Sequence, residues 1–146
     1  MDSLENKLGY KFKNEKLLET ALTHSSYASE HGKHYEFNNE RLEFLGDAFL
    51  DAIIGKKMFA VMPEAHEGVL SKTRADVVCE RSLAEVASQL ELGEYLKLGH
   101  GEENGGGRQK TSIVGDAVEA VIGAMIIDGG YAAAEQVANA DRKSVV

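Results

Sequence analysis

The sequence of 146 residues is poor in the residues that mark several common protein classes: it has one cysteine, one proline and no tryptophan. The single cysteine, Cys79, excludes an internal disulfide and a zinc site built from cysteines. No stretch approaches about 18 uninterrupted apolar residues, so we expect no membrane span. The N-terminal segment MDSLENKLGYKF lacks the basic, apolar and small-residue regions of a signal peptide. We therefore expect a cytoplasmic location.

Positive charge is scarce as well. Sixteen lysines and arginines face 24 aspartates and glutamates, which gives a formal net charge of −8. This balance argues against a strongly basic nucleic-acid binder, because such affinity depends on neutralising phosphates. It leaves room for a weaker binder, since acids gathered at a metal site would be offset by the metal ions where a phosphate approaches.

The residues that are present describe one globular domain. Apolar residues make up 43% of the chain and charged residues 27%, and a chain of this length can bury a sizeable core. Runs such as LAEVASQLEL and the single proline predict an all-α fold, without internal repeat or linker, over residues 1–146. The patterns predict helices over residues 1–8, 14–23, 38–61, 64–78, 82–92, 111–128 and 132–140, and loops over residues 23–34 and 100–109.

One predicted helix, NERLEFLGDAFLDAIIG at residues 39–55, is mostly apolar or small yet contains an acidic stripe. Glu43 and Asp47 are four residues apart and therefore lie on one face, one turn apart. Glu40 extends the same stripe by three residues. An ionised carboxylate that is buried without a partner is costly, so these groups need a cation, a metal ion or a neutralising proton.

A second apolar helix carries another acidic pair. In IVGDAVEAVIGAMII, residues 113–127, the only charged residues are Asp116 and Glu119, three apart and on one face. A helix that is apolar nearly all round lies centrally in a fold. If the two stripes face each other, four carboxylates surround one point, and such hard oxygen ligands suit Mg²⁺ or Mn²⁺.

Two alternatives stay open for these acids. A single acidic pair on a helix is usually a solvated face, although two such pairs on two apolar helices favour a metal site. The other alternative is a di-iron bundle, which places Glu-x-x-His on paired helices. Here the residue three after Glu43 is Gly46, and neither helix carries a histidine.

Beyond the acids, the segment NERLEFLGDAFL at residues 39–50 closely resembles the signature of the ribonuclease III catalytic domain. Other segments that resemble blocks of that family follow in the right order, over roughly residues 4–135. They are LGYKF at 8–12, ALTHSSY at 21–27, EGVLSKTRADVV at 67–78, LGHGE at 98–102 and GDAVEAVIGAMIIDGG at 115–130.

The resemblance implies an Mg²⁺-dependent endonuclease that cuts double-stranded RNA and leaves 5′-phosphate and 3′-hydroxyl ends with short 3′ overhangs, in RNA processing. By position, Glu43, Asp47, Asp116 and Glu119 correspond to the metal ligands, and Asp47 and Glu119 also to catalytic residues. Mn²⁺ is expected to substitute. In such a site two metal ions about 4 Å apart activate the attacking water and stabilise the leaving oxygen.

The resemblance also implies a homodimer in which each subunit cuts one strand. Glu40 and Glu67 correspond to further family acids near the catalytic valley and the dimer contact. The apolar surface of the helix over residues 39–55 agrees with a self-complementary dimer face.

Contacts with RNA are harder to assign. The glycine-rich segment at residues 100–109 lacks the Gly-Lys-Ser/Thr ending of a P-loop. We take it as a flexible rim, with Arg108 and Lys110 as candidate RNA contacts together with Lys72 and Arg74.

Family members of the bacterial type usually continue into a double-stranded RNA-binding domain, and this chain ends at Val146 without one. We expect a truncated or a naturally short endonuclease domain, whose RNA binding is weak and strongly salt-sensitive.

Two other candidates have simpler explanations. His24, between threonine and serine, is expected to make structural hydrogen bonds, and Cys79 to be a small buried filler. The main alternative function is a dimeric partner in RNA processing that binds metal and duplex RNA without cutting. The presence of all four acids favours the enzyme.

Overall fold

The computed structural model describes residues 2–32 and 37–140, and this part of the chain contains nine α-helices and no named strand. The prediction of an all-α fold is therefore confirmed. The helices are α1 (Asp2–Leu8), α2 (Glu15–Ala21), α3 (Ser25–Glu30), α4 (Glu40–Val61), α5 (Glu67–Val77), α6 (Glu80–Leu90), α7 (His100–Asn104), α8 (Thr111–Gly129) and α9 (Tyr131–Ala138), with short 3₁₀ helices η2 (Leu92–Tyr95) and η3 (Gly107–Gln109).

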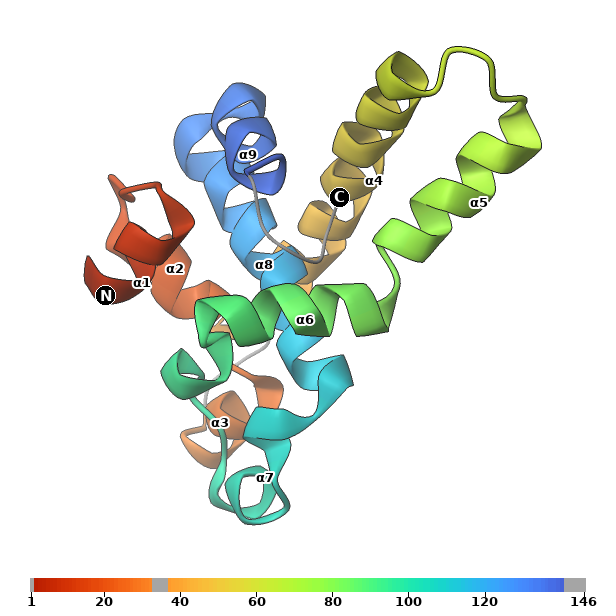
Figure 1. Cartoon of the computed structure of the whole chain (residues 1–146). Coiled ribbons are helices and arrows are strands. Elements are labelled where there is room, and N and C mark those ends of the chain that lie inside the picture. Colours follow the sequence, from red (N-terminus) through yellow and green to blue (C-terminus); the bar gives the residue numbers. More distant parts are fainter. Residues whose placement is uncertain (1, 33–36, 141–146) are drawn as a thin grey trace.

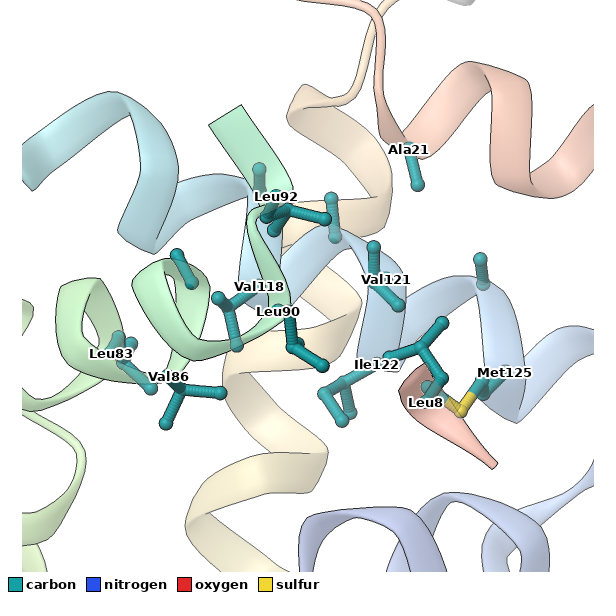
Figure 2. Close-up of a cluster of buried hydrophobic side chains, with 14 of the residues drawn as sticks. Leu8, Ala21, Leu83, Val86, Leu90, Leu92, Val118, Val121, Ile122 and Met125 are labelled. Atoms are coloured by element: carbon teal, nitrogen blue, oxygen red, sulfur yellow. The ribbon is translucent and has the colours of Figure 1, made fainter. Parts of the chain in front are cut away.

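Helix α8 is the central element. Every residue from Ile113 to Met125 is buried except Asp116. The helix packs against α4, α6, α9 and α2, and Figure 1 shows it passing through the middle of the bundle. Figure 2 shows the side chains of Val118, Val121 and Ile122 from α8 meeting apolar side chains of α6 and α1 in the core. An apolar helix of this kind is predicted to be central, and here it is.

The closest helix contact, between α4 and α8, depends on two glycines. A Cβ atom built on Gly46 of α4 would lie 1.6 Å from the carbonyl oxygen of Glu119, and one built on Gly123 of α8 would lie 2.1 Å from that of Leu42. Real Cβ atoms do not approach within 3.0 Å of other heavy atoms. The absence of a side chain at both positions lets the two backbones touch where the acids lie.

One predicted helix start and one predicted helix end are confirmed in the N-terminal part. The Asn14 side-chain oxygen accepts a hydrogen bond of 3.1 Å from the backbone N–H of Lys16, at the start of α2. Gly9 has a φ of +76°, the left-handed conformation that ends a helix such as α1. Parts of the predicted first helix, of the first predicted loop and of the chain end lie outside the described residues. These parts are residues 1, 33–36 and 141–146.

Two predicted loops are wrong, because they contain helices α3 and α7. His24 caps α3 by accepting a 3.1 Å hydrogen bond from Ser26 N–H through Nδ1, and histidine is not among the usual capping residues. Glu30 of α3 accepts hydrogen bonds from the backbone N–H and the Nδ1 of His100 in α7. Tertiary contacts of this kind stabilise helices too short to form alone.

Helices α4 and α5 form a hairpin that projects from the bundle (Figure 1). Helix α5 has no buried residue, and Phe59 and Val61 at the end of α4 and Val69 on α5 are exposed. Within the described residues, no helix combines the length and apolar character that a membrane span requires.

Candidate metal centre

The acidic stripes of α4 and α8 face each other at the glycine contact. Helix α4 carries Glu43 and Asp47, while Asp116 and Glu119 lie on α8. One carboxylate oxygen each of Glu43, Asp116 and Glu119 lies within 4.8 Å of the other two. Two stripes far apart in the sequence therefore meet at one point, as the two apolar helices predicted.

Asp47 joins the cluster through Glu119. A hydrogen bond between these two side chains is among the causes that raise the pKa of Glu119. Asp47 also lines a surface hollow together with Glu40, Glu43 and Glu119, beside the exposed ring of Phe44. The cluster is thus open to solvent on the α4 side, although Glu119 itself is buried.

The acids hold protons more tightly than ordinary carboxyls. Burial, the hydrogen bond with Asp47 and the charges of the neighbouring acids raise the pKa of Glu119 to about 9. Burial and the charges of Asp116, Glu40 and Asp47 raise the pKa of Glu43 to about 7. Desolvation and like charges both disfavour the ionised form. No basic group appears among the causes of either shift.

The pKa values of two acids at the edges of the cluster, Asp116 and Asp51, are raised as well. Burial and the charge of Glu80 raise the pKa of Asp116, against a lowering effect of His24. Burial and Asp47 raise the pKa of Asp51, one turn further along α4, against a lowering effect of Arg74. His24 and Arg74 thus act on the edges of the cluster, whereas Glu43 and Glu119 at its centre have only acids as charged neighbours that shift their pKa values, which leaves room for a cation.

The donor set fits a hard divalent ion. Carboxylate oxygens alone converge here, with no cysteine or histidine in the cluster. Mg²⁺ and Mn²⁺ prefer such oxygen ligands, and Mg²⁺ often keeps several waters beside one or two carboxylates. Binding of a divalent ion would also remove the repulsion that raises the pKa values of Glu43 and Glu119.

Comparison with known proteins decides the family. A family model described as Ribonuclease-III-like matches residues 14–142. The chain belongs to the ribonuclease-III-like family. It is 53% identical over 133 residues to Ribonuclease 3 of Oleidesulfovibrio alaskensis, covering 91% of this chain and 58% of that protein. It is 49% identical over 134 residues to Ribonuclease 3 of Caldanaerobacter subterraneus subsp. tengcongensis, covering 92% and 58%.

Solved structures of the family share the fold. Two structures of the nuclease domain of ribonuclease III from Campylobacter jejuni are each 44% identical to this chain, with TM-scores of 0.88 and 0.87, over 94% of this chain and 92% and 90% of theirs. One of them was described for structural flexibility in a region involved in dimer formation. The chain spans a little under three-fifths of the length of the curated relatives named above, about 58%.

The remaining acids predicted from the family lie in two places. Glu40 lies beside Glu43 in the hollow. Glu67 begins α5, beyond the far end of α4, and the hydroxyl of Ser71 donates a hydrogen bond to it. Between Glu43 and the end of α4 the axial rise is about 27 Å, so this protomer's Glu67 is separate from its own cluster. Its place near a dimer contact stays a prediction.

Three of the four candidate RNA contacts make ion pairs within the chain, and the fourth, Arg74, lies against α4. Arg108 donates hydrogen bonds of 2.8 and 2.7 Å to the carbonyl oxygens of Gly93 and Leu96 and pairs with Glu103. The other three contacts are Lys110 with Glu102 at 2.6 Å, Lys72 with Asp76 at 3.5 Å, and the guanidinium of Arg74 beside Gly55 of α4. Their role in RNA binding stays a prediction.

Sequence reasoning missed two neighbours of the centre. Glu80, at the start of α6, lies near enough to raise the pKa of Asp116, and its carboxylate accepts a 2.5 Å hydrogen bond from the Thr111 hydroxyl. Phe44, between Glu43 and Leu45, points its ring to solvent beside the hollow. Neither has a signal in the sequence, because Glu80 comes close only through tertiary packing and Phe44 is one more apolar residue in an apolar helix.

Proposed function

We propose that this chain is the catalytic part of a divalent-metal-dependent endoribonuclease. It hydrolyses double-stranded RNA to 5′-phosphate and 3′-hydroxyl ends with short 3′ overhangs, in RNA processing. The observation that carries the proposal is the convergence of the α4 and α8 acids in a chain of the ribonuclease-III-like family. The relatives of similar sequence are named Ribonuclease 3.

Glu43, Asp47, Asp116 and Glu119 would hold Mg²⁺, with Mn²⁺ as a substitute. Metal in such a site activates water as a nucleophile and stabilises the oxygen that leaves phosphorus. Glu40, which lines the same hollow, is proposed as a supporting acid near the catalytic valley.

Proton binding by the chain's own acids accompanies this chemistry. Because the pKa of Glu119 is about 9 without a metal, at neutral pH this carboxyl carries a proton and shares a hydrogen bond with Asp47. As a ligand it must be ionised, so its proton leaves when a cation is bound. The buried position of Glu119 fixes the orientation of its carboxylate, which a flexible surface acid would not provide.

Two copies of the chain are proposed to form the working unit. Phe44, with 79% of its surface exposed, and Phe59, with 75%, lie on one helix, α4, and Val69 on α5 adds to the apolar surface. A two-fold dimer through α4 and α5 would bury these side chains. Each subunit would then supply one acid cluster, one for each strand of the RNA.

RNA binding by this chain is proposed to be weak and sensitive to salt, because a net charge of −8 opposes the phosphate backbone. Cations held at the acid cluster would supply part of the missing attraction. The basic residues that already make ion pairs would have to exchange an acid for a phosphate.

The test is cleavage of duplex RNA against single-stranded RNA of the same sequence, in Mg²⁺, by the wild-type chain and by Glu119→Gln. Glutamine imitates the protonated acid in shape, so the variant should fold and dimerise normally while cleavage is abolished. Asp51→Asn is the matched control, because Asp51 lies on the same stripe of α4 one turn beyond Asp47 and should leave most cleavage intact.

Three results would reject parts of this proposal. Cleavage by Glu119→Gln at the wild-type rate would remove the acid cluster from the reaction. A wild-type chain that binds Mn²⁺ and duplex RNA but never cuts would favour the non-cutting partner. Tight RNA binding by this chain in a gel-shift assay at moderate salt would contradict the weak-binding prediction.

A further inference from the structure

A second group of acids gathers where α1 meets the start of α2, outside the cluster described above. Asp2 and Glu5 lie on α1, and Glu15 begins α2. One carboxylate oxygen of each lies within 4.8 Å of the other two. Exposed acids often gather without any ligand, so a case for a binding site must come from another feature of this group.

That feature is the side chain of Glu5, which is only 4% exposed. Its Oε2 accepts a 2.7 Å hydrogen bond from the backbone N–H of Phe12. Its Oε1 is buried, and no group of the described chain donates a hydrogen bond to it. Buried polar atoms nearly always have such a partner, and a missing partner indicates strain, function or a bound water or ion.

Among the residues that the structure describes, the basic group beside Glu5 is Lys11, and it does not provide this hydrogen bond. Lys11 Nζ lies 3.9 Å from Glu5 Oε1 and 3.7 Å from Asp2 Oδ1, and the lysine side chain is 77% exposed. Both distances exceed a hydrogen bond, and an exposed ammonium contributes little to a pair. Three carboxylates therefore face one solvated lysine.

The geometry points to a divalent-cation site formed by Asp2, Glu5 and Glu15, separate from the catalytic acids. The ligands are hard oxygens, which suit Ca²⁺, Mg²⁺ or Mn²⁺. Asn6 lines the same hollow as Asp2 and Glu5 and offers an amide oxygen in addition. The ion gives Glu5 Oε1 its missing partner and ties α1 to α2. This tie holds Leu4 and Leu8 of α1 in the core.

Mn²⁺ alone is the probe for this site. The protein would carry Asp116→Asn and Glu119→Gln, so that the α4–α8 cluster does not dominate binding. In ¹⁵N-resolved spectra, substoichiometric Mn²⁺ should broaden the amide signals of α1 and of the start of α2 before those of α5 and α7, which do not pack against α1. Ca²⁺ should compete and restore the signals.

Two further variants decide the outcome. The double variant Asp2→Asn/Glu15→Gln changes only exposed side chains and should abolish the selective broadening. The control is Glu19→Gln, which changes an exposed acid one turn further along α2 and should leave the broadening unchanged. Lys11→Ala removes the competing charge and should tighten Mn²⁺ binding by roughly three- to fivefold. The proposed site would be overturned if Asp2→Asn/Glu15→Gln left the broadening at α1 as it is in the Asp116→Asn/Glu119→Gln protein. It would also be overturned if that protein showed no broadening at α1.

Discussion

The contact between α4 and α8 is most sharply tested by replacing Gly46 with alanine. A Cβ at Gly46 would lie 1.6 Å from the carbonyl oxygen of Glu119, and the acceptable minimum is 3.0 Å. The atom that it meets belongs to the backbone of the central helix and cannot rotate away. The two helices must therefore separate by at least about 1.4 Å at this point.

The size of the effect follows from two opposing terms. Alanine in place of glycine inside a helix favours folding by about 1 kcal/mol. Overpacking a rigid contact typically costs about 1–3 kcal/mol, and more where backbone meets backbone. Because the separation also loosens Leu50 and Ile53 of α4 in the core, we expect the overpacking cost to lie at the upper end of its range, which leaves a net loss of about 2 kcal/mol in the free energy of unfolding.

Gly55→Ala is the matched control on the same helix. Its Cβ would meet only the side chain of Arg74, at 3.4 Å, which can move. Urea unfolding followed by circular dichroism should show this variant as stable as the wild type or up to about 1 kcal/mol more stable. The reasoning is refuted if Gly46→Ala unfolds at the same urea concentration as Gly55→Ala.

Three further predictions concern protonation, a structural carboxylate and assembly. In metal-free protein the raised pKa values of Glu119, about 9, and Glu43, about 7, mean that the folded state binds these protons more tightly than the unfolded state. The free energy of unfolding should therefore fall as pH rises from about 5 to 9, and urea titrations with a chelator should show a flatter dependence for Glu119→Gln. Asp128 accepts hydrogen bonds from the Tyr10 hydroxyl and from the backbone N–H groups of residues 13 and 14, at 2.6–2.9 Å. Asp128→Ala should therefore lower the free energy of unfolding by about 1–3 kcal/mol in urea titrations, without loss of cleavage. Phe59→Ser should shift the chain from dimer to monomer in sedimentation velocity, and an unchanged dimer would place the interface elsewhere.

The two helices of the acid cluster could be predicted from the sequence because each carries an unusual conflict. Residues 113–127 have no charge other than Asp116 and Glu119, and a buried helix carries such acids only for a reason. The facing of the two stripes followed from their shared need for a cation. The distance between the two helices could not be predicted, because it depends on the contact at Gly46 and Gly123. Glycine occurs in helices for many reasons, so neither position indicated a close approach.

Helices α3 and α7 escaped prediction for the opposite reason. Each is a short polar helix with no apolar face, and its ends are held by tertiary contacts. His24 caps α3, the Ser26 hydroxyl accepts a 2.9 Å hydrogen bond from Gly99 N–H, and Arg108 clamps the carbonyl oxygens of residues 93 and 96. Apart from the His24 cap, these pairings join residues that are 12 or more positions apart in the sequence, so the glycine-rich segment looked like a loop. The resulting lobe places Arg108 in a structural role that its position in the sequence did not indicate.

The close approach of α4 and α8 explains how the protein holds together acids that repel one another. Apart, Glu43 and Glu119 would be solvated and ionised at neutral pH, with pKa values near 4.5. The packing of a helix that is apolar on every other side keeps Glu119 buried, and the energy of that packing offsets the cost of the desolvated carboxyl. A divalent cation bound in place of the protons would relieve the repulsion among these acids. If α4 and α8 hold the proposed metal ion, its affinity should fall in any variant that lets the two helices separate.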